Sequence, residues 1–288
     1  MVAIRDPGGQ IAPRGIRGER GVRARVREIV AHRSVLRLLI TRDLKVKYEK
    51  SVLGYVWSIL EPLLLAFVYY FVFGVIMGVG TEDYLVYLLA GLLPWLWASS
   101  TINASTGALT GQARLIKTSS VPREIWVLRL VGAKWVDYVL SLPVLVLFAI
   151  LYRRAPHLGH LALLPFVMVV QAILLTGIAL LLSSISVMFR DVKNIVKIVM
   201  RLLFYFSPIL YGFEKIQRLP DWIVRFYTLN PFVGILELNR AVWFPDELHN
   251  AGISWMSAVL PTIVLTAALF ALGWTVFARL ERAVLKEL

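Results

Sequence analysis

Long apolar runs alternate with short charged stretches along most of the chain, and this alternation predicts an all-α membrane protein. A membrane-spanning helix needs about 20 mostly apolar residues. Six stretches approach or meet that length, and the shortest contains Pro208, so we expect it to be broken or re-entrant. The predicted spans lie at 56–79, at 84–106, within 126–152, within 161–189, within 195–211 and within 255–279.

The segment before the first span divides into two parts. Residues 1–24 combine arginine with glycine and offer few apolar side chains to bury, so we expect a disordered basic tail in the cytoplasm. Residues 25–50 carry apolar side chains at roughly helical spacing among arginines, which predicts an amphipathic helix in the cytoplasmic membrane interface. Residues 51–288 then form the transmembrane domain.

Residues 212–254 are too many for a simple turn between two spans. Asn230-Pro231 is typical of a helix N-cap followed by proline at the first helical position. Asp221-Trp222 is a second candidate helix start. We therefore expect two short helices on the outer face that dip partly into the membrane.

Composition and charge support the membrane interpretation. Hydrophobic residues make up 58% of the chain and the net charge is +13, whereas a soluble domain is about 45–50% apolar. Thirteen of the 31 Lys and Arg residues precede residue 51 and most others flank the ends of apolar runs. This placement favours a membrane protein with both termini in the cytoplasm over a nucleic-acid-binding protein. Arg153 and Arg154, in an outer loop, are a local exception.

Several kinds of chemistry are missing from the sequence. There is no cysteine and no phosphate-binding P-loop pattern, and His157 and His160 have no third metal ligand nearby. We therefore expect no catalytic residue, cofactor or metal site in this chain. Energy for transport would come from ions or from another subunit. The spans also lack the buried acidic or histidine chain of a proton-driven carrier.

A few ionisable residues interrupt the spans. Glu61 precedes Pro62 near the inner end of the first span, where it either caps the helix or controls access to a polar cavity. Lys134 and Asp137 are three residues apart, so they share a helical face and can pair close to water.

Aromatic residues cluster in the first and fifth spans more densely than a membrane-interface belt requires. Aromatic faces stack on sugar rings and their polar tips bond hydroxyls, although packing against lipid explains the clusters equally well. The glycan-channel candidates are Tyr69, Tyr70, Phe71, Phe204, Tyr205 and Tyr211.

Short motifs in a fixed order resemble the permeases of ABC exporters that move lipid-linked polysaccharides such as O-antigen, capsule, teichoic acid and galactan. Each motif is short, and their order and spacing make the likeness specific. The Arg-rich residues 1–24 lie outside it. The motifs are Arg42–Tyr48 (RDLKVKY), Leu53–Trp57 (LGYVW), Glu61–Leu64 (EPLL), Gly91–Trp95 (GLLPW), Lys117–Glu124 (KTSSVPRE), Phe189–Asp191 (FRD), Ser207–Tyr211 (SPILY) and Leu229–Phe232 (LNPF).

This resemblance implies a homodimer in the bacterial inner membrane with two separate ATPase subunits that bind ATP and Mg²⁺. Loop 112–124 would contain a coupling helix seated on the ATPase, or else it is an ordinary basic connection. Segment 212–254 would close the channel on the outside. The coupling candidates are Arg114, Lys117, Pro122, Arg123 and Glu124, and the outer-gate candidates are Trp222, Phe226, Pro231 and Phe232.

The expected substrate is a glycan linked to a polyprenyl pyrophosphate, recognised beside the cytoplasmic interface helix, where an anion requires Lys or Arg. The candidates for this contact are Arg42, Lys45, Lys47, Lys50 and Glu61. Two other functions stay open: an ABC exporter permease for a drug or small lipid, and an ion-driven carrier.

Overall fold

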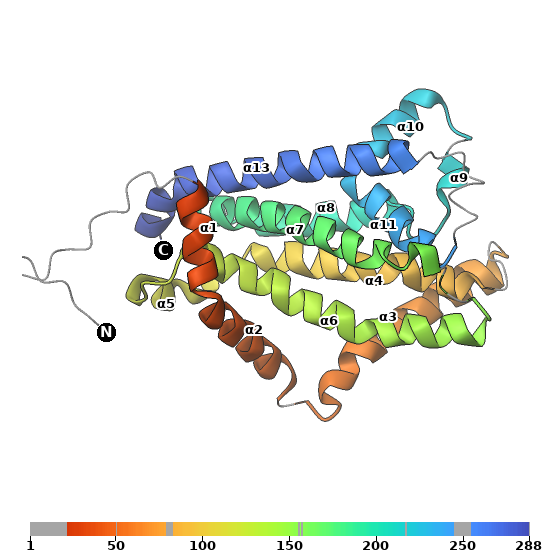
Figure 1. Ribbon diagram of the computed structural model, residues 1–288, viewed down its shortest axis with the longest axis horizontal. Helices are drawn as coiled ribbons and strands as arrows, with labels where there is room; N and C mark the ends of the chain where they lie inside the picture. Colours follow the sequence, from red (N-terminus) through yellow and green to blue (C-terminus); the bar gives the residue numbers. More distant parts are fainter. Residues whose placement is uncertain are drawn as a thin grey trace, which may run out of the picture.

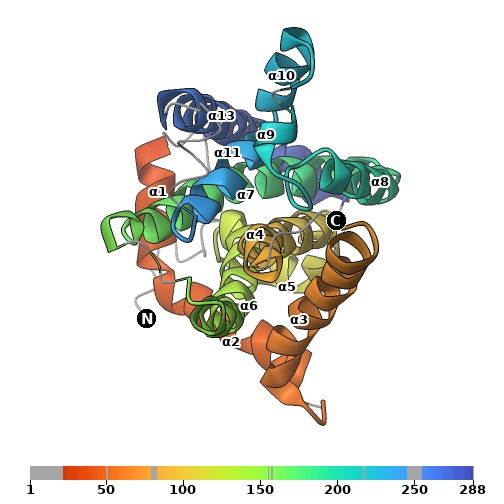
Figure 2. The same ribbon diagram turned by 90° about the vertical axis from the view of Figure 1, so that its right-hand side faces the viewer.

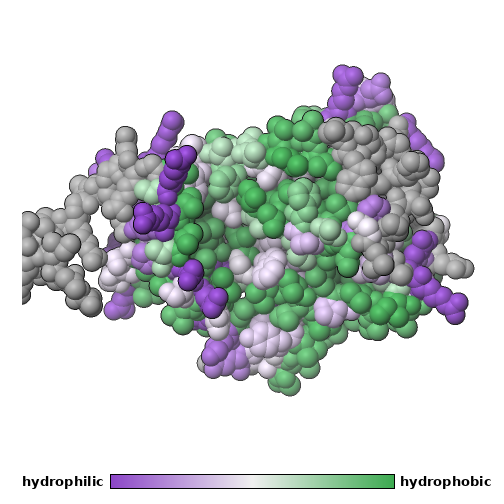
Figure 3. Space-filling view, in the orientation of Figure 1, coloured by the Kyte–Doolittle hydropathy of each residue, from purple (hydrophilic) through white to green (hydrophobic). Residues whose placement is uncertain are grey.

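A computed structural model describes residues 22–49, 51–78, 83–154, 156, 158–216, 218–244 and 255–287, and every regular element within these ranges is a helix. The long helices run side by side as one bundle (Figure 1). A mostly hydrophobic surface covers the middle of the bundle and hydrophilic residues gather at both ends (Figure 3). This distribution is that of a protein that crosses a membrane.

Helix α4 (Tyr84–Ser105) forms the centre of the bundle, surrounded by α3 (Trp57–Tyr69), α6 (Arg123–Leu151) and α7 (Leu163–Met188), as the end-on view in Figure 2 shows. Most of its residues are buried. It is apolar on all sides, which is the pattern of a helix enclosed by other helices.

Five helices are long and apolar enough to span a membrane: Gly54–Ile76, Tyr84–Ser105, Arg123–Leu151, Leu163–Met188 and Val259–Glu287. The first contains a π-helical segment, Tyr70–Ile76, which continues α3 and which the apolar pattern did not predict. The fifth predicted span instead overlaps α8 (Val192–Tyr205), whose 14 residues extend only about 21 Å. The count of six spans therefore stays a prediction.

Helices α7 and α13 (Trp255–Glu287) form the most extensive helix pair. Their backbones meet at Gly177 and Gly273, where a Cβ on Gly273 would lie 1.9 Å from the carbonyl oxygen of Gly177. Small residues allow this close approach of two helices in a membrane.

One end of the bundle, which we call the terminal end, carries α1 (Val22–Ala31), α2 (Arg33–Tyr48), α5 (Ala113–Thr118) and the C-terminal part of α13 (Figure 1). Residues 25–50 were predicted to form one amphipathic interface helix, and the structure has two helices there, which meet at His32. The ring nitrogen Nδ1 of His32 lies 2.8 Å from the carbonyl oxygen of Glu28. Residues 1–21 of the predicted tail and Lys50 lie outside the described residues.

The opposite end, the loop end, carries α9 (Phe213–Ile216), α10 (Asp221–Thr228) and α11 (Pro231–Ala241). The predicted N-cap is present, since the backbone N–H of Phe232 donates to Oδ1 of Asn230 at 3.0 Å. Helix α10 projects from the bundle (Figure 2), whereas α11 is buried against α4, α7 and α13. Residues 245–254 of the predicted outer segment lie outside the described residues.

Candidate functional site

A groove with a volume of about 440 Å³ opens on the side of the bundle between α3, α4 and α8. Helix α4 runs toward the terminal end, whereas α8 runs away from it. Residues late in α4 and early in α8 therefore share the terminal half of the groove. Residues early in α4 and late in α8 share the other half.

Aromatic rings line the half of the groove that is nearer the loop end. The ring centroid of Phe204 lies 5.5 Å from that of Tyr69, 5.9 Å from that of Trp95 and 5.2 Å from that of Tyr205. Trp95 also meets Phe232 of α11 edge to face, with the centroids 5.5 Å apart. Three helices thus hold a continuous aromatic wall whose outermost ring, Tyr205, is exposed.

Polar and cationic side chains line the half nearer the terminal end: Ser99, Asn103, Lys197 and Arg201. Within the described part of the chain, Lys197 and Arg201 have no carboxylate within ion-pair distance. A cation facing lipid at the middle of a bilayer costs about 2.5–3.5 kcal/mol, so such residues face water or a ligand. This half of the groove is therefore suited to anions.

The structure divides the predicted aromatic candidates into two groups. Tyr69, Phe204 and Tyr205 line the groove. Tyr70 stacks on Tyr84 inside the bundle, and Phe71 is exposed on the bundle surface.

Tyr211 turns back toward the bundle, where its hydroxyl donates to the backbone oxygen of Tyr205 at 2.6 Å. Lys197 and Arg201 were missed by the sequence reasoning. Their signal was spacing, because residues four apart share one face of a helix.

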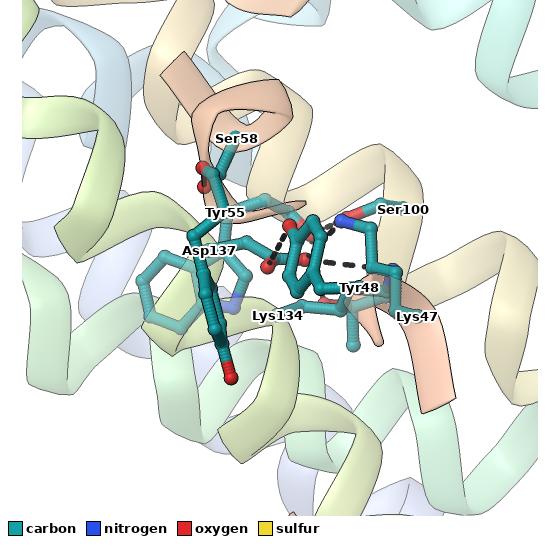
Figure 4. A network of polar contacts seen from close by, with 9 residues as sticks. Lys47, Tyr48, Tyr55, Ser58, Ser100, Lys134 and Asp137 are labelled. Carbon is teal, nitrogen blue, oxygen red and sulfur yellow. Dashed lines mark hydrogen bonds and ion pairs between the residues drawn. The ribbon is translucent and has the colours of Figure 1, made fainter. Parts of the chain in front are cut away.

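Two of the predicted lipid-pyrophosphate candidates, Lys47 and Arg42, are engaged in ion pairs within the protein. Lys47 pairs with Asp137 of α6 at 2.8 Å, and the hydroxyl of Tyr48 donates to the same carboxylate at 2.7 Å (Figure 4). Lys134 lies 3.7 Å from that carboxylate, so it forms the predicted pair with Asp137. Burial lowers the pKa of Lys47, but Asp137 and Tyr48 outweigh burial and raise it.

Two further candidates at α2 differ in their availability. Arg42 lies 3.2 Å from Asp43, which also pairs with the buried Arg129 of α6. Lys45 is exposed, and within the described residues it has no ion-pair partner. Glu61 is exposed on α3.

The predicted coupling loop also contains two kinds of residue. Arg114, Leu115 and Lys117 of α5 are exposed around the buried Ile116, so α5 presents a basic surface at the terminal end.

Arg123 and Glu124 instead hold the start of α6. Glu124 pairs with Arg25 of α1 at 2.8 Å, and Glu281 of α13 pairs with both Arg25 and Arg123. Pro122, beside them, is buried. These three candidates serve internal packing rather than a free surface.

The outer-gate candidates differ in their exposure to solvent. Trp222 and Phe226 of α10 are 71% and 74% exposed, whereas Phe232 of α11 is buried beneath the aromatic wall. Pro231 begins α11.

Helix α11 also carries a buried ion pair. Arg240 lies 3.0 Å from Glu237, donates to the backbone oxygen of Ile209 at 2.7 Å and covers the ring of Tyr87 at 3.8 Å. These contacts fasten the end of α11 to α4 and to the turn after α8.

An all-helical bundle with apolar spans and a polar, aromatic side groove defines a multi-pass membrane protein. The chain belongs to the ABC-2 type transporter family, whose sequence profile matches residues 34–244.

The O-antigen export system permease protein RfbA of Klebsiella pneumoniae is 32% identical over 232 residues, which cover 80% of this chain and 88% of that protein. The Myxococcus xanthus protein of the same name is 30% identical over 84% of this chain and 93% of its own length. The polysialic acid transport protein KpsM of Escherichia coli is 26% identical over 78% of this chain and 87% of its own length.

Proposed function

We propose that this chain is the permease subunit of an ATP-driven ABC exporter that moves a lipid-linked polysaccharide across the bacterial inner membrane. The groove carries the proposal, because aromatic faces suit sugar rings and the adjacent cations suit an anionic group. Family membership and relatives named for O-antigen export and polysialic acid transport support it.

The terminal end is the cytoplasmic end in this proposal, in agreement with the concentration of Lys and Arg in residues 1–50. Helix α5 is then the coupling helix. Its exposed Arg114, Leu115 and Lys117 contact a separate ATPase subunit, which binds ATP and Mg²⁺. The ion pairs of Glu124 and Glu281 connect the base of this loop to α1 and α13.

A second copy of the chain completes the channel in this proposal. Helices α3 and α8 flank the groove and expose large apolar side chains, including Val68 and Leu202. An apolar face beside an aqueous path must be covered by lipid or protein. A homodimer with two ATPases would place two grooves opposite each other around one path.

The lipid carrier's pyrophosphate first meets the exposed Lys45 of α2 in this proposal. Lys47 is held by Asp137, so it serves mainly to fix α2 against α6. Charge reversal at Lys45 should reduce export more than charge reversal at Arg42, whose guanidinium already faces Asp43.

Depletion of this chain in its native bacterium tests the function. We expect a lipid-linked glycan to accumulate on the cytoplasmic side, and a tagged chain to co-purify with an ATPase. An unchanged glycan pool together with loss of drug or small-lipid efflux would overturn the polysaccharide proposal. Transport that persists without ATP hydrolysis and follows an ion gradient would overturn the ABC mechanism.

A further inference from the structure

We infer that the groove between α3, α4 and α8 binds the junction between a sugar and its phosphate group in the lipid-linked substrate. This inference rests on the proposed function and deepens it. It assigns the phosphate to Lys197 and Arg201 and the adjoining sugar ring to Tyr205 and the aromatic wall behind it.

The two cations are in the right place for this role. Lys197 and Arg201 lie one helical turn apart on α8 and both line the groove. Arg201 lies about 14 Å along the axis from Val192, the first residue of α8. Other basic residues of the bundle, such as Arg129 and Arg240, are neutralised by carboxylates of this chain. Among the described residues no carboxylate neutralises Lys197 or Arg201, which leaves both cations open to an anion from outside the chain.

The neighbouring polar groups favour phosphate. An arginine fork bonds two phosphate oxygens at once, and a lysine adds a point charge. Across the groove, the hydroxyl of Ser99 can donate a hydrogen bond. The side-chain amide of Asn103 donates to the backbone oxygen of Ser99 at 2.8 Å and lies 3.5 Å from its hydroxyl oxygen, which leaves the hydroxyl hydrogen of Ser99 to donate.

The aromatic wall supplies the second half of the site. Phe204 is three residues from Arg201 on α8, so its ring shares the same helical face. Tyr205 and Tyr69 extend that wall from α8 and α3. A ligand that holds its phosphate at Arg201 therefore places a directly attached sugar ring against these faces. An apolar lipid anion would satisfy the cations and leave the polar tips of the two tyrosines unused.

The test measures binding of synthetic farnesyl-diphosphate-N-acetylglucosamine to the full-length chain in phosphatidylcholine nanodiscs. We expect Lys197→Gln and Arg201→Gln each to weaken binding at least tenfold, and Arg201→Lys to recover part of the loss. Lys286→Gln is the control, because Lys286 is an exposed lysine of α13 that does not line the groove. It should bind the probe like the unaltered chain.

Three further binding measurements identify which chemical group of the ligand the groove recognises. Tyr205→Ala should weaken binding of the glycosylated probe severalfold and leave binding of farnesyl diphosphate unchanged. Farnesyl N-acetylglucosaminide, which has no phosphate, should bind at least tenfold more weakly than the full probe. Phosphatidylglycerol that competes as well as the probe would show that the cations hold ordinary lipid headgroups, which would overturn the inference.

Failure of this site is distinguishable from failure of the proposed function. If depletion accumulates glycan but the Lys197→Gln, Arg201→Gln double variant restores export and binds the probe normally, only the site assignment is wrong. If depletion accumulates no glycan, the proposed function is wrong. The Arg201→Lys variant and size-exclusion profiles separate loss of binding from loss of folding.

Discussion

Gly273 of α13 is the position where the smallest change should most disturb the bundle. A methyl group there would lie 1.9 Å from the carbonyl oxygen of Gly177, 2.7 Å from its carbonyl carbon and 3.0 Å from its Cα. All three are backbone atoms, so no side chain can rotate away. Gly273→Ala therefore forces α7 and α13 apart.

The size of the effect follows from the distances. Ordinary van der Waals contact begins at about 3.4 Å, so the two backbones must separate by about 1.5 Å at this point. Overpacking of a closely packed interior costs about 1–3 kcal/mol. This corresponds to a change of roughly 5- to 150-fold in the unfolding equilibrium. Gly177→Ala should have a similar effect, because its Cβ would lie 2.5 Å from Cα of Phe270.

The assay is denaturant unfolding of the full-length chain in detergent, followed by circular dichroism. Gly111→Ala is the control, since a Cβ there meets nothing within 4 Å; its stability should stay the same or rise slightly. The Gly177→Ala, Gly273→Ala double variant should lose less free energy of unfolding than the two single variants added together, because one separation of the helices relieves both clashes. Equal midpoints for Gly273→Ala and the unaltered chain would refute the close contact.

Three other perturbations test the polar contacts. Arg240→Leu removes the cation from a buried ion pair and should destabilise the chain by about 3–5 kcal/mol in the same unfolding assay, with much of the loss recovered by adding Glu237→Leu. Asp137→Asn removes a charge that raises the pKa of Lys47, so more of this amine is neutral and an amine-acylating reagent should modify it faster. An unchanged rate of modification by mass spectrometry would contradict the ion pair. Lys117→Glu should reduce ATPase co-purification without shifting the unfolding midpoint, and a shifted midpoint would show that α5 is structural.

The apolar pattern predicted the helices that are long and uniform. Five of the six predicted spans coincide with helices that can cross a membrane, because about 20 apolar residues in a row have few other stable arrangements. The pattern did not predict the break at His32, because helical spacing of apolar residues continues on both sides of it.

Helix α11 shows why burial was harder to predict than secondary structure. The sequence predicted a short helix on the outer face here, yet its Glu237 and Arg240 are both buried. Their charges are satisfied by each other, and Arg240 also contacts Ile209 and Tyr87, which are distant in the sequence. No local pattern contains those partners, so the position of α11 depends on the folded bundle.

The same reasoning separates the predicted site residues that are available to a ligand from those that are not. Positive charge selected Lys47, and the resemblance to exporter permeases selected Arg123 and Glu124. Each has an internal partner as many as 158 residues away. Spacing along α8 selects Lys197 and Arg201, which face the groove without such partners in the described residues. A basic residue in a membrane protein is therefore informative about ligands only after the carboxylates of its own chain have been assigned. Once they are, Lys197 and Arg201 are the cations without a carboxylate partner in the described residues that lie beside the aromatic wall, where phosphate and sugar would meet.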